Sequence, residues 1–252
     1  MIRPGLVSIT FRKLTPAEIV RLAVEAGLEG IEWGGDVHVP HGEAAIAREV
    51  ARMTADHGLN VAAYGSYYRA AVSEAKGLSF EAVLSSAKEL GAPVIRIWAG
   101  AKGSLELSPG EREAVVADVR RVAEMAAREG IAIALEYHRN TLTDTPESTR
   151  GLLESCAHPN LRTYWQPRAG VPAAENARGL ERVLPWLSHL HVYHWWPDSQ
   201  RLPLREGRDA WNLYFREAGR AEGDRYAMLE FVASDTPEQC LEDARALVEL
   251  LD

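Results

Sequence analysis

Short apolar runs alternate with amphipathic segments along the whole chain of 252 residues. The apolar runs predict eight buried strands, at residues 5–11, 28–33, 59–65, 93–98, 131–137, 161–166, 188–194 and 226–231. The amphipathic segments predict helices near residues 16–26, 43–57, 79–90, 110–129, 147–155, 175–184, 208–219 and 237–250. Strands that alternate with helices are typical of a parallel sheet. Eight such units of about 31 residues predict an α/β fold, a (β/α)₈ TIM barrel that forms a single domain over residues 1–252.

Three segments carry the residues that typically start a helix. They are Thr15-Pro-Ala-Glu18, Ser108-Pro-Gly-Glu111 and Thr236-Pro-Glu-Gln239, and each joins a capping hydroxyl, a proline and a Glu or Gln that caps in return. A doubly wound open sheet is the alternative arrangement of the same elements. It usually has a Gly-rich first turn, and residues 10–14, at the end of the first predicted strand, contain no glycine. The barrel is therefore favoured.

Two glutamates, Glu136 and Glu230, each end an apolar run that is predicted to be a buried strand. In βα barrels the active site lies at the carboxyl ends of the strands, so both side chains are candidates for it. Burying a carboxylate is costly unless the group is paired or binds a metal. An ion pair with Arg96 or Arg139 is the structural alternative to a functional role.

Histidine and amide groups occur at two further strand ends. His189 and His191 are alternate residues of one predicted strand and therefore share a face. A histidine combined with two carboxylates suits Mn²⁺, Zn²⁺, Fe²⁺ or Co²⁺ better than a cage of oxygens alone would. Gln166 ends the sixth predicted strand, and its amide oxygen is a weaker ligand. The alternatives for Gln166 are a structural hydrogen bond or a contact with substrate.

Aromatic and cationic side chains also gather at the predicted strand ends. Five tryptophans, at positions 33, 98, 165, 195 and 196, are expected to form the wall of a pocket. The candidates for substrate binding are Arg12, Trp33, Arg96, Trp98, His138 and His194. No glycine cluster follows the seventh or eighth strand, where barrels commonly hold a phosphate, which disfavours a phosphorylated substrate.

The bulk composition argues against several classes of protein. The formal net charge of −8 disfavours a nucleic-acid-binding protein, whose surface is usually basic. No apolar run approaches the ~18 residues of a membrane span, and no signal-peptide pattern is present, so we expect a cytoplasmic protein. Cys156 and Cys240 lack a CxxC spacing and are expected to be packing residues. The motifs GxSxG, P-loop and HExxH are absent.

Four motifs together resemble the xylose-isomerase-like TIM barrels, and more narrowly the sugar (phosphate) isomerase/epimerase group. They are Ala134-Leu-Glu-Tyr-His138, Pro159-Asn-Leu-Arg-Thr-Tyr-Trp-Gln166, His189-Leu-His191 and Leu229-Glu-Phe231. The resemblance implies one divalent metal (Mn, Zn, Mg, Co or Fe), held by Glu136, Gln166, His191 and Glu230. The family's sixth-strand motif is Asp-x-x-His, whereas this chain has Gln166-Pro-Arg-Ala169. An amide therefore replaces one carboxylate ligand, and a substrate-binding histidine is missing.

The same resemblance implies an isomerase or epimerase that acts on a small sugar or keto-polyol by proton transfer through an enediolate. Glu136 and Glu230 would be its acid/base pair. A dehydratase of the inosose type is the first alternative, because the same enediolate can expel a β-hydroxyl. A non-catalytic sugar-binding protein on a degenerate scaffold is the other alternative, motivated by Gln166. No nucleic-acid or membrane partner is expected, and a homo-oligomer is compatible with the sequence.

Overall fold

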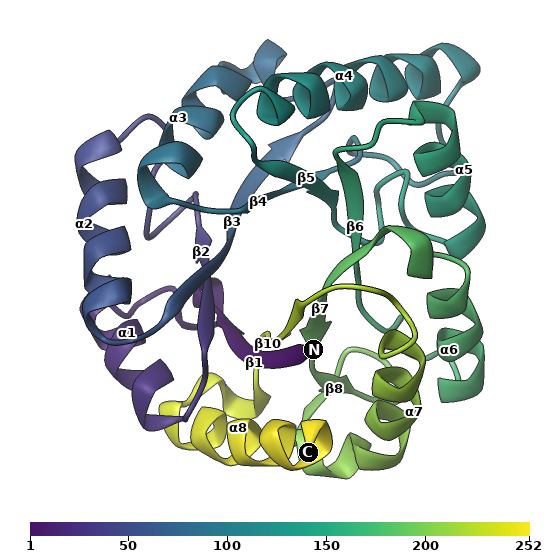
Figure 1. The fold of residues 1–252 in the computed structure, drawn as a ribbon. Helices are drawn as coiled ribbons and strands as arrows, with labels where there is room; N and C mark the ends of the chain where they lie inside the picture. Colours follow the sequence, from purple (N-terminus) through teal and green to yellow (C-terminus); the bar gives the residue numbers. More distant parts are fainter.

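Eight parallel strands close into a barrel in the computed structural model, which describes residues 1–252 (Figure 1). Around the barrel the strand order is β1-β10-β7-β6-β5-β4-β3-β2, so the last strand of the chain pairs with the first. The strands are β1 (Ile2–Val7), β2 (Gly30–Gly34), β3 (Asn60–Arg69), β4 (Val94–Trp98), β5 (Ala132–Leu135), β6 (Leu161–Trp165), β7 (Leu187–Val192) and β10 (Arg225–Leu229). The predicted TIM barrel is confirmed.

Eight α-helices surround the barrel as an outer ring (Figure 1). They are α1 (Pro16–Glu25), α2 (Ala44–Asp56), α3 (Phe80–Leu90), α4 (Pro109–Ala127), α5 (Pro146–Cys156), α6 (Ala173–Glu181), α7 (Arg208–Ala218) and α8 (Pro237–Leu251). The predicted helix starts are confirmed: Thr15 and Ser108 form complete capping boxes, and the Thr236 hydroxyl accepts a hydrogen bond from the Gln239 N–H. Each cap satisfies N–H groups that the first helical turn leaves unpaired.

Several predicted strands differ from the structure at their ends: the third runs on to Arg69 and the fifth ends at Leu135, and larger changes affect the first and seventh. The first strand begins at Ile2 and ends at Val7, earlier than predicted, because residues 8–11 form a 3₁₀ turn, η1 (Ser8–Phe11). The seventh strand ends at Val192, and a short antiparallel hairpin of β8 (His194–Trp195) and β9 (Arg201–Leu202) follows it. The other 3₁₀ turns are η2 (Glu74–Lys76), η3 (Leu184–Trp186), η4 (Leu204–Gly207) and η5 (Ala233–Asp235). Trp195 of this hairpin lines the same cavity as Glu136 and Glu230 at the carboxyl end of the barrel.

The apolar core has two layers, because alternate residues of each strand face the barrel interior or the helices. The interior layer is small and consists of Val7, Ile9, Ala62, Ala63, Val94, Ala134, Tyr164 and Met228. A much larger cluster fills the space between the barrel and the helices. Trp33 and Trp165 belong to this outer layer: Trp33 Nε1 donates to Thr54 of α2, and Trp165 packs edge-on against Tyr214 of α7.

Both cysteines are buried free thiols, which confirms their expected role in packing. Cys156 closes α5, and Cys240 lies in the second turn of α8. Among the helices of the structure, none has the length and apolar character that crossing a bilayer requires.

Candidate metal centre and catalytic cavity

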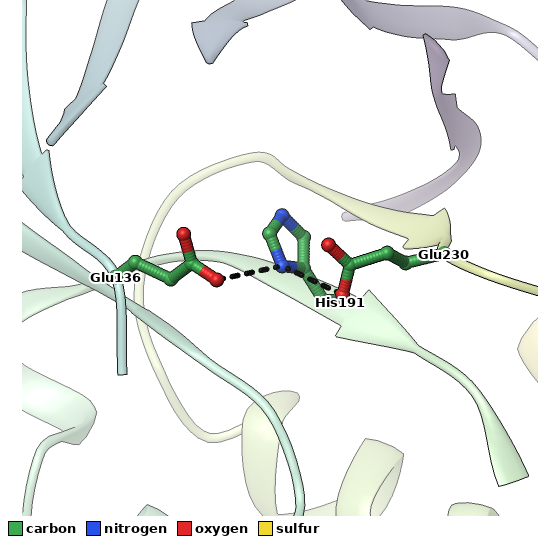
Figure 2. A group of neighbouring side chains, drawn as sticks. All are labelled: Glu136, His191 and Glu230. Carbon is green, nitrogen blue, oxygen red and sulfur yellow. Dashed lines mark ion pairs between the residues drawn. The ribbon is translucent and has the colours of Figure 1, made fainter. Parts of the chain in front are cut away.

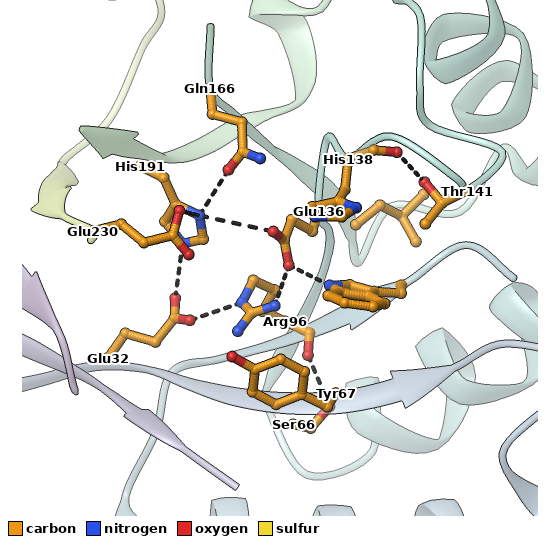
Figure 3. A network of polar contacts seen from close by, with 12 residues as sticks. Glu32, Ser66, Tyr67, Arg96, Glu136, His138, Thr141, Gln166, His191 and Glu230 are labelled. Carbon is orange, nitrogen blue, oxygen red and sulfur yellow. Dashed lines mark hydrogen bonds and ion pairs between the residues drawn. The ribbon is translucent and has the colours of Figure 1, made fainter. Parts of the chain in front are cut away.

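Six polar side chains meet at the carboxyl end of the barrel and face its axis (Figure 3). They are Glu32 on β2, Arg96 on β4, Glu136 after β5, Gln166 after β6, His191 on β7 and Glu230 after β10. All six are buried, and none is more than 9% exposed. Arg96, Glu136, Gln166 and Glu230 each lie two residues beyond an interior apolar residue of the same run, which explains why they share the inner face.

His191 lies at the centre of the ligand-type groups, and its Nδ1 atom faces three oxygens. Nδ1 is 2.9 Å from Gln166 Oε1, 3.3 Å from Glu230 Oε2 and 4.0 Å from Glu136 Oε1. Figure 2 shows Glu136 and Glu230 reaching toward the ring from opposite sides. One ligand atom from each of Glu136, His191 and Glu230 lies within 4.8 Å of the others. One imidazole nitrogen and several oxygens form a donor set that fits a divalent metal.

The charges of this cluster also fit a divalent cation. Three carboxylates and the Arg96 guanidinium leave two net negative charges when His191 is neutral. Burial of two uncompensated charges is very costly, so the cluster needs a counter-charge. Without a metal, a proton on His191 supplies part of it: burial opposes this proton, but the carboxylates of Glu230 and Glu32 outweigh burial and raise the pKa of His191 to about 10.

Metal binding should therefore depend on pH. Below pH 10 the metal must displace the proton from His191 Nδ1, so its affinity should rise with pH from 6 to 9, by up to about tenfold per unit. Isothermal titration of metal-free protein with Mn²⁺ in buffers of different ionisation enthalpy measures the proton released. A single proton per Mn²⁺ at pH 7.5 is the expected value. A flat affinity profile, with no proton released, would contradict the assignment of His191 as a ligand.

Arg96 connects two carboxylates of the cluster (Figure 3). Its Nε donates to Glu32 Oε1 at 2.7 Å, and its Nη1 donates to Glu136 Oε2. Trp98 Nε1 donates to the same oxygen of Glu136. Burial opposes ionisation of Glu136, but Arg96 outweighs it and holds the pKa of this carboxyl below its ordinary value. Glu136 is thus a fixed carboxylate, whereas Glu230 makes no ion pair with an arginine or lysine.

A cavity of about 450 Å³ opens over Glu136, Gln166 and Glu230. Its walls include the aromatic rings of Tyr193, Trp195 and Phe231. His138 also lines it and stacks on Trp98, with ring centroids 4.7 Å apart. His138 Nδ1 donates to the carbonyl of Arg139, which leaves Nε2 to contact a ligand. A small polar molecule with an apolar face would fit this space.

The sequence comparison assigns the family. A model described as "Xylose isomerase-like TIM barrel" matches residues 20–250. The chain belongs to this family. Its resemblance to the xylose-isomerase-like barrels, first inferred from four short motifs, is thereby confirmed.

Members of the xylose isomerase-like family with different reactions are similar to this chain. A 3-dehydroshikimate dehydratase from Bacillus anthracis is 30% identical over 204 residues, which cover 74% of this chain and 70% of that protein. The crystal structure of the probable 3-DHS dehydratase AsbF, involved in petrobactin synthesis in Bacillus anthracis, superposes with a TM-score of 0.82 at 24% identity and covers 98% of this chain and 99% of that one. D-psicose 3-epimerase from Clostridium cellulolyticum H10, with D-tagatose, has a TM-score of 0.73 at 15% identity, covering 98% and 97%. The two structural likenesses show the fold.

The structure brings together the four ligands that the family resemblance implied, Glu136, Gln166, His191 and Glu230 (Figure 3). The ion pair of Glu136 with Arg96, raised as the structural alternative, is also present. The two roles do not compete, because Arg96 binds Oε2 while the other oxygen of Glu136 faces His191. His189 lies below the centre, where Nδ1 accepts from the Tyr226 N–H.

Four expected substrate contacts lie elsewhere. Trp33 faces the helix layer because its neighbour Glu32 faces the barrel, and alternate strand residues point in opposite directions. Arg96 is only 1% exposed and is engaged by two carboxylates, so it has no surface to offer a substrate. His194 packs over Gly207 of η4, outside the 450 Å³ cavity. Arg12 forms an exposed ion pair with Asp36 at the rim.

The expected tryptophan wall is only partly correct. Trp195 lines the 450 Å³ cavity, and Trp98 contacts two residues that line it, Glu136 and His138. Trp165 lies in the helix layer, and Trp196 lines a separate neighbouring cavity of about 320 Å³. Tyr193 and Phe231 complete the aromatic wall, although the sequence did not single them out.

Glu32 is the charged residue of the cluster that was not predicted to belong to the site. It is fully buried on β2 and pairs with Arg96. A weaker signal for it existed, because Glu32 lies near the end of the predicted strand 28–33 and directly follows Ile31, as Glu136 and Glu230 follow leucines.

Proposed function

We propose that this protein is a divalent-metal-dependent dehydratase of a cyclic hydroxyketone acid, with 3-dehydroshikimate as the first substrate to test. This proposal rests on a difference in the side-chain partners of Glu136 and Glu230, the two glutamates beside His191. Arg96 and Trp98 hold Glu136, whereas no cationic side chain other than His191 pairs with Glu230. A dehydration needs a single base, and one carboxylate that no arginine or lysine holds suffices for it. A two-base epimerisation needs a second such group to return the proton on the opposite face.

In the proposed dehydration, different residues of the cavity act as the base and as the acid. Glu230 removes the proton from the carbon next to the carbonyl, and the electron pair of that C–H bond forms a carbon–carbon double bond. The hydroxyl on the following carbon leaves as water with a proton from His138, whose Nε2 is available to a ligand. A divalent metal held by Glu136, Gln166, His191 and Glu230 would supply Lewis-acid stabilisation of the charge on the carbonyl oxygen. With 3-dehydroshikimate, transfer of a further ring proton to the ketone oxygen completes an aromatic 3,4-dihydroxybenzoate.

Two arginines at the cavity favour a substrate with a carboxylate over a neutral sugar. Arg139 lines the cavity, is exposed and makes no ion pair. Arg168 also lines it, and its Nε is buried without a hydrogen-bond partner while Nη2 pairs with Glu175. Guanidinium groups are well suited to bind carboxylates. The sequence relationship to the Bacillus anthracis dehydratase supports the same choice.

The direct test is incubation of the Mn²⁺-loaded protein with 3-dehydroshikimate. We expect one equivalent of 3,4-dihydroxybenzoate per substrate consumed, measured by ultraviolet absorbance and mass spectrometry. Parallel reactions in D₂O use D-fructose, D-tagatose and an inosose. Deuterium entering one carbon of a keto-sugar, with no dehydration of any substrate, would overturn the proposal in favour of an epimerase. No reaction at all in the presence of bound sugar would favour a non-catalytic binding protein.

Replacing Arg139 with Ala should weaken substrate binding more than turnover. One charge-assisted hydrogen bond contributes about 1.5–3 kcal/mol, so KM for 3-dehydroshikimate should rise at least about tenfold while kcat changes little. Steady-state kinetics measure both constants. Arg128→Ala is the matched control, because Arg128 is an exposed arginine that directly follows α4 and does not line the cavity. Equal KM values for the two variants would remove Arg139 from the substrate site.

An epimerase or isomerase of a keto-sugar is the second candidate. Glu136 and Glu230 flank His191 Nδ1 from two sides, an arrangement that two-base proton transfer also requires (Figure 2). This candidate needs Arg96 to release Glu136 during turnover. The D₂O experiment distinguishes the two reactions.

A further inference from the structure

Glu32 is a carboxylate with one oxygen unaccounted for. Its side chain is completely buried on β2, and Arg96 Nε donates to Oε1 at 2.7 Å. Oε2 has no hydrogen-bond partner. An unsatisfied buried carboxylate oxygen is costly, so the position calls for an explanation beyond the ion pair.

The unpartnered oxygen faces a second unpartnered atom, His191 Nε2, at 3.5 Å (Figure 3). The other nitrogen of the same ring, Nδ1, faces Gln166, Glu230 and Glu136. An imidazole that binds a metal through Nδ1 carries its remaining proton on Nε2. That N–H is then a donor 3.5 Å from Glu32 Oε2, so in one tautomer of the ring a small approach would pair the two orphaned atoms with each other.

The surrounding chain fixes Glu32 in this place. Gly65 on β3 lies against it: a Cβ there would come within 2.6 Å of Glu32 Oε1 and 2.7 Å of Arg96 Nη2. Any other residue at position 65 would displace the ion pair. Arg96 in turn connects Glu32 to Glu136. One guanidinium therefore binds both a candidate ligand, Glu136, and the carboxylate that faces His191.

We infer that Glu32 is a positioning residue of the metal centre. It accepts the Nε2–H of His191, selects the tautomer with Nδ1 free and holds the ring toward the other ligands. Glu32 does not touch substrate, because it is fully buried and does not line the cavity. The inference rests on the metal centre of the proposed function, but it concerns metal binding and is independent of the reaction catalysed.

The first test measures Mn²⁺ affinity by isothermal titration of metal-free protein. Loss of a partner behind a metal-binding histidine typically costs about 10–100-fold in affinity, and we expect this loss in Glu32→Gln. Glu29→Gln is the matched control, since Glu29 directly precedes β2 and pairs with Arg3 on the surface. It should bind Mn²⁺ like the wild type. Affinity of Glu32→Gln within threefold of the wild type would overturn the inference.

A second measurement needs only the wild-type protein and covers the case in which Glu32→Gln does not fold. Long-range ¹H–¹⁵N spectra of ¹⁵N-histidine-labelled, Zn²⁺-loaded protein report which ring nitrogen carries the proton, with His191→Gln to assign the signal. A proton on Nε2 supports the inference, and a proton on Nδ1 overturns it. In folded Glu32→Gln, the Nε2–H signal should exchange faster with water. Failure of the wild type to bind Mn²⁺ or Zn²⁺ would refute the metal centre itself, together with this inference.

Discussion

Glu230→Gln should abolish turnover while the fold stays intact. Loss of a general base lowers kcat by about 10²–10⁴-fold, and loss of a ligand charge beside His191 adds to this effect. Glu230 follows β10 directly, lines the cavity and has its Oε2 3.3 Å from His191 Nδ1. The amide keeps the size of the side chain but can neither accept the proton nor carry the charge. Production of 3,4-dihydroxybenzoate at saturating Mn²⁺ and 3-dehydroshikimate measures the loss.

Two controls separate a chemical effect from a structural one. Glu238→Gln changes an exposed glutamate in the first turn of α8 and should leave kcat unchanged. Circular dichroism of metal-free Glu230→Gln should show the wild-type fold, whereas its melting temperature should change because the variant loses the carboxylate that pairs with protonated His191. Activity above a tenth of the wild-type value, with Mn²⁺ bound, would exclude Glu230 as the base.

The barrel could be predicted because the sequence signals for its strands and helices lie within a few residues of each element. Each strand is a short apolar run, and helix starts such as Thr15 and Ser108 carry capping groups within three residues. The ends of the first and seventh strands were less predictable. Ser8–Phe11 and His194–Trp195 have the composition of strands, but tertiary contacts turn the first into a 3₁₀ turn and pair the second with Arg201–Leu202.

The candidate metal ligands could be predicted because the barrel brings the strand ends together, whatever the conformation of the loops. Glu136, His191 and Glu230 follow apolar residues at these ends, so topology alone gathers them. The orientation of Trp33 was also available in principle: once Glu32 is assigned to the interior, its neighbour must face the helices. The expectation was wrong because position at a strand end was considered without the alternation of faces.

The ion-pair network could not be predicted from the sequence. Arg96 joins Glu32 and Glu136 across strands β2, β4 and β5, and the pair with Glu32 depends on the missing side chain of Gly65 on the strand between them. No local pattern encodes which carboxylate a buried arginine selects. In the proposed dehydratase, this network holds Glu136 in place and leaves Glu230 available as the base.

Arg96→Met should cause a large loss of stability in the metal-free protein. The methionine fills much of the same volume but leaves Glu32 and Glu136 buried without their counter-charge. Removing one partner of a buried ion pair typically costs about 3–5 kcal/mol, which in a chain of this size lowers Tm by about 6–20 °C. Urea unfolding at pH 7 measures the difference in free energy. Arg69→Met is the matched control: Arg69 lies over the Trp98 ring without a carboxylate partner, so its loss should cost about 1 kcal/mol or less.

Because uncompensated charge causes the loss of stability in Arg96→Met, two further results are expected. Despite burial, Arg96 holds the pKa values of Glu32 and Glu136 below their ordinary value of 4.5, so its stabilisation is present above that pH and is lost as the carboxyls become protonated. The difference in the free energy of unfolding between the wild type and Arg96→Met should therefore become smaller below about pH 4.5. The double variant Glu32→Gln/Arg96→Met should be more stable than Arg96→Met, although it carries one more substitution, because it buries one charge fewer. A double variant less stable than Arg96→Met would assign the loss to packing and contradict the electrostatic account.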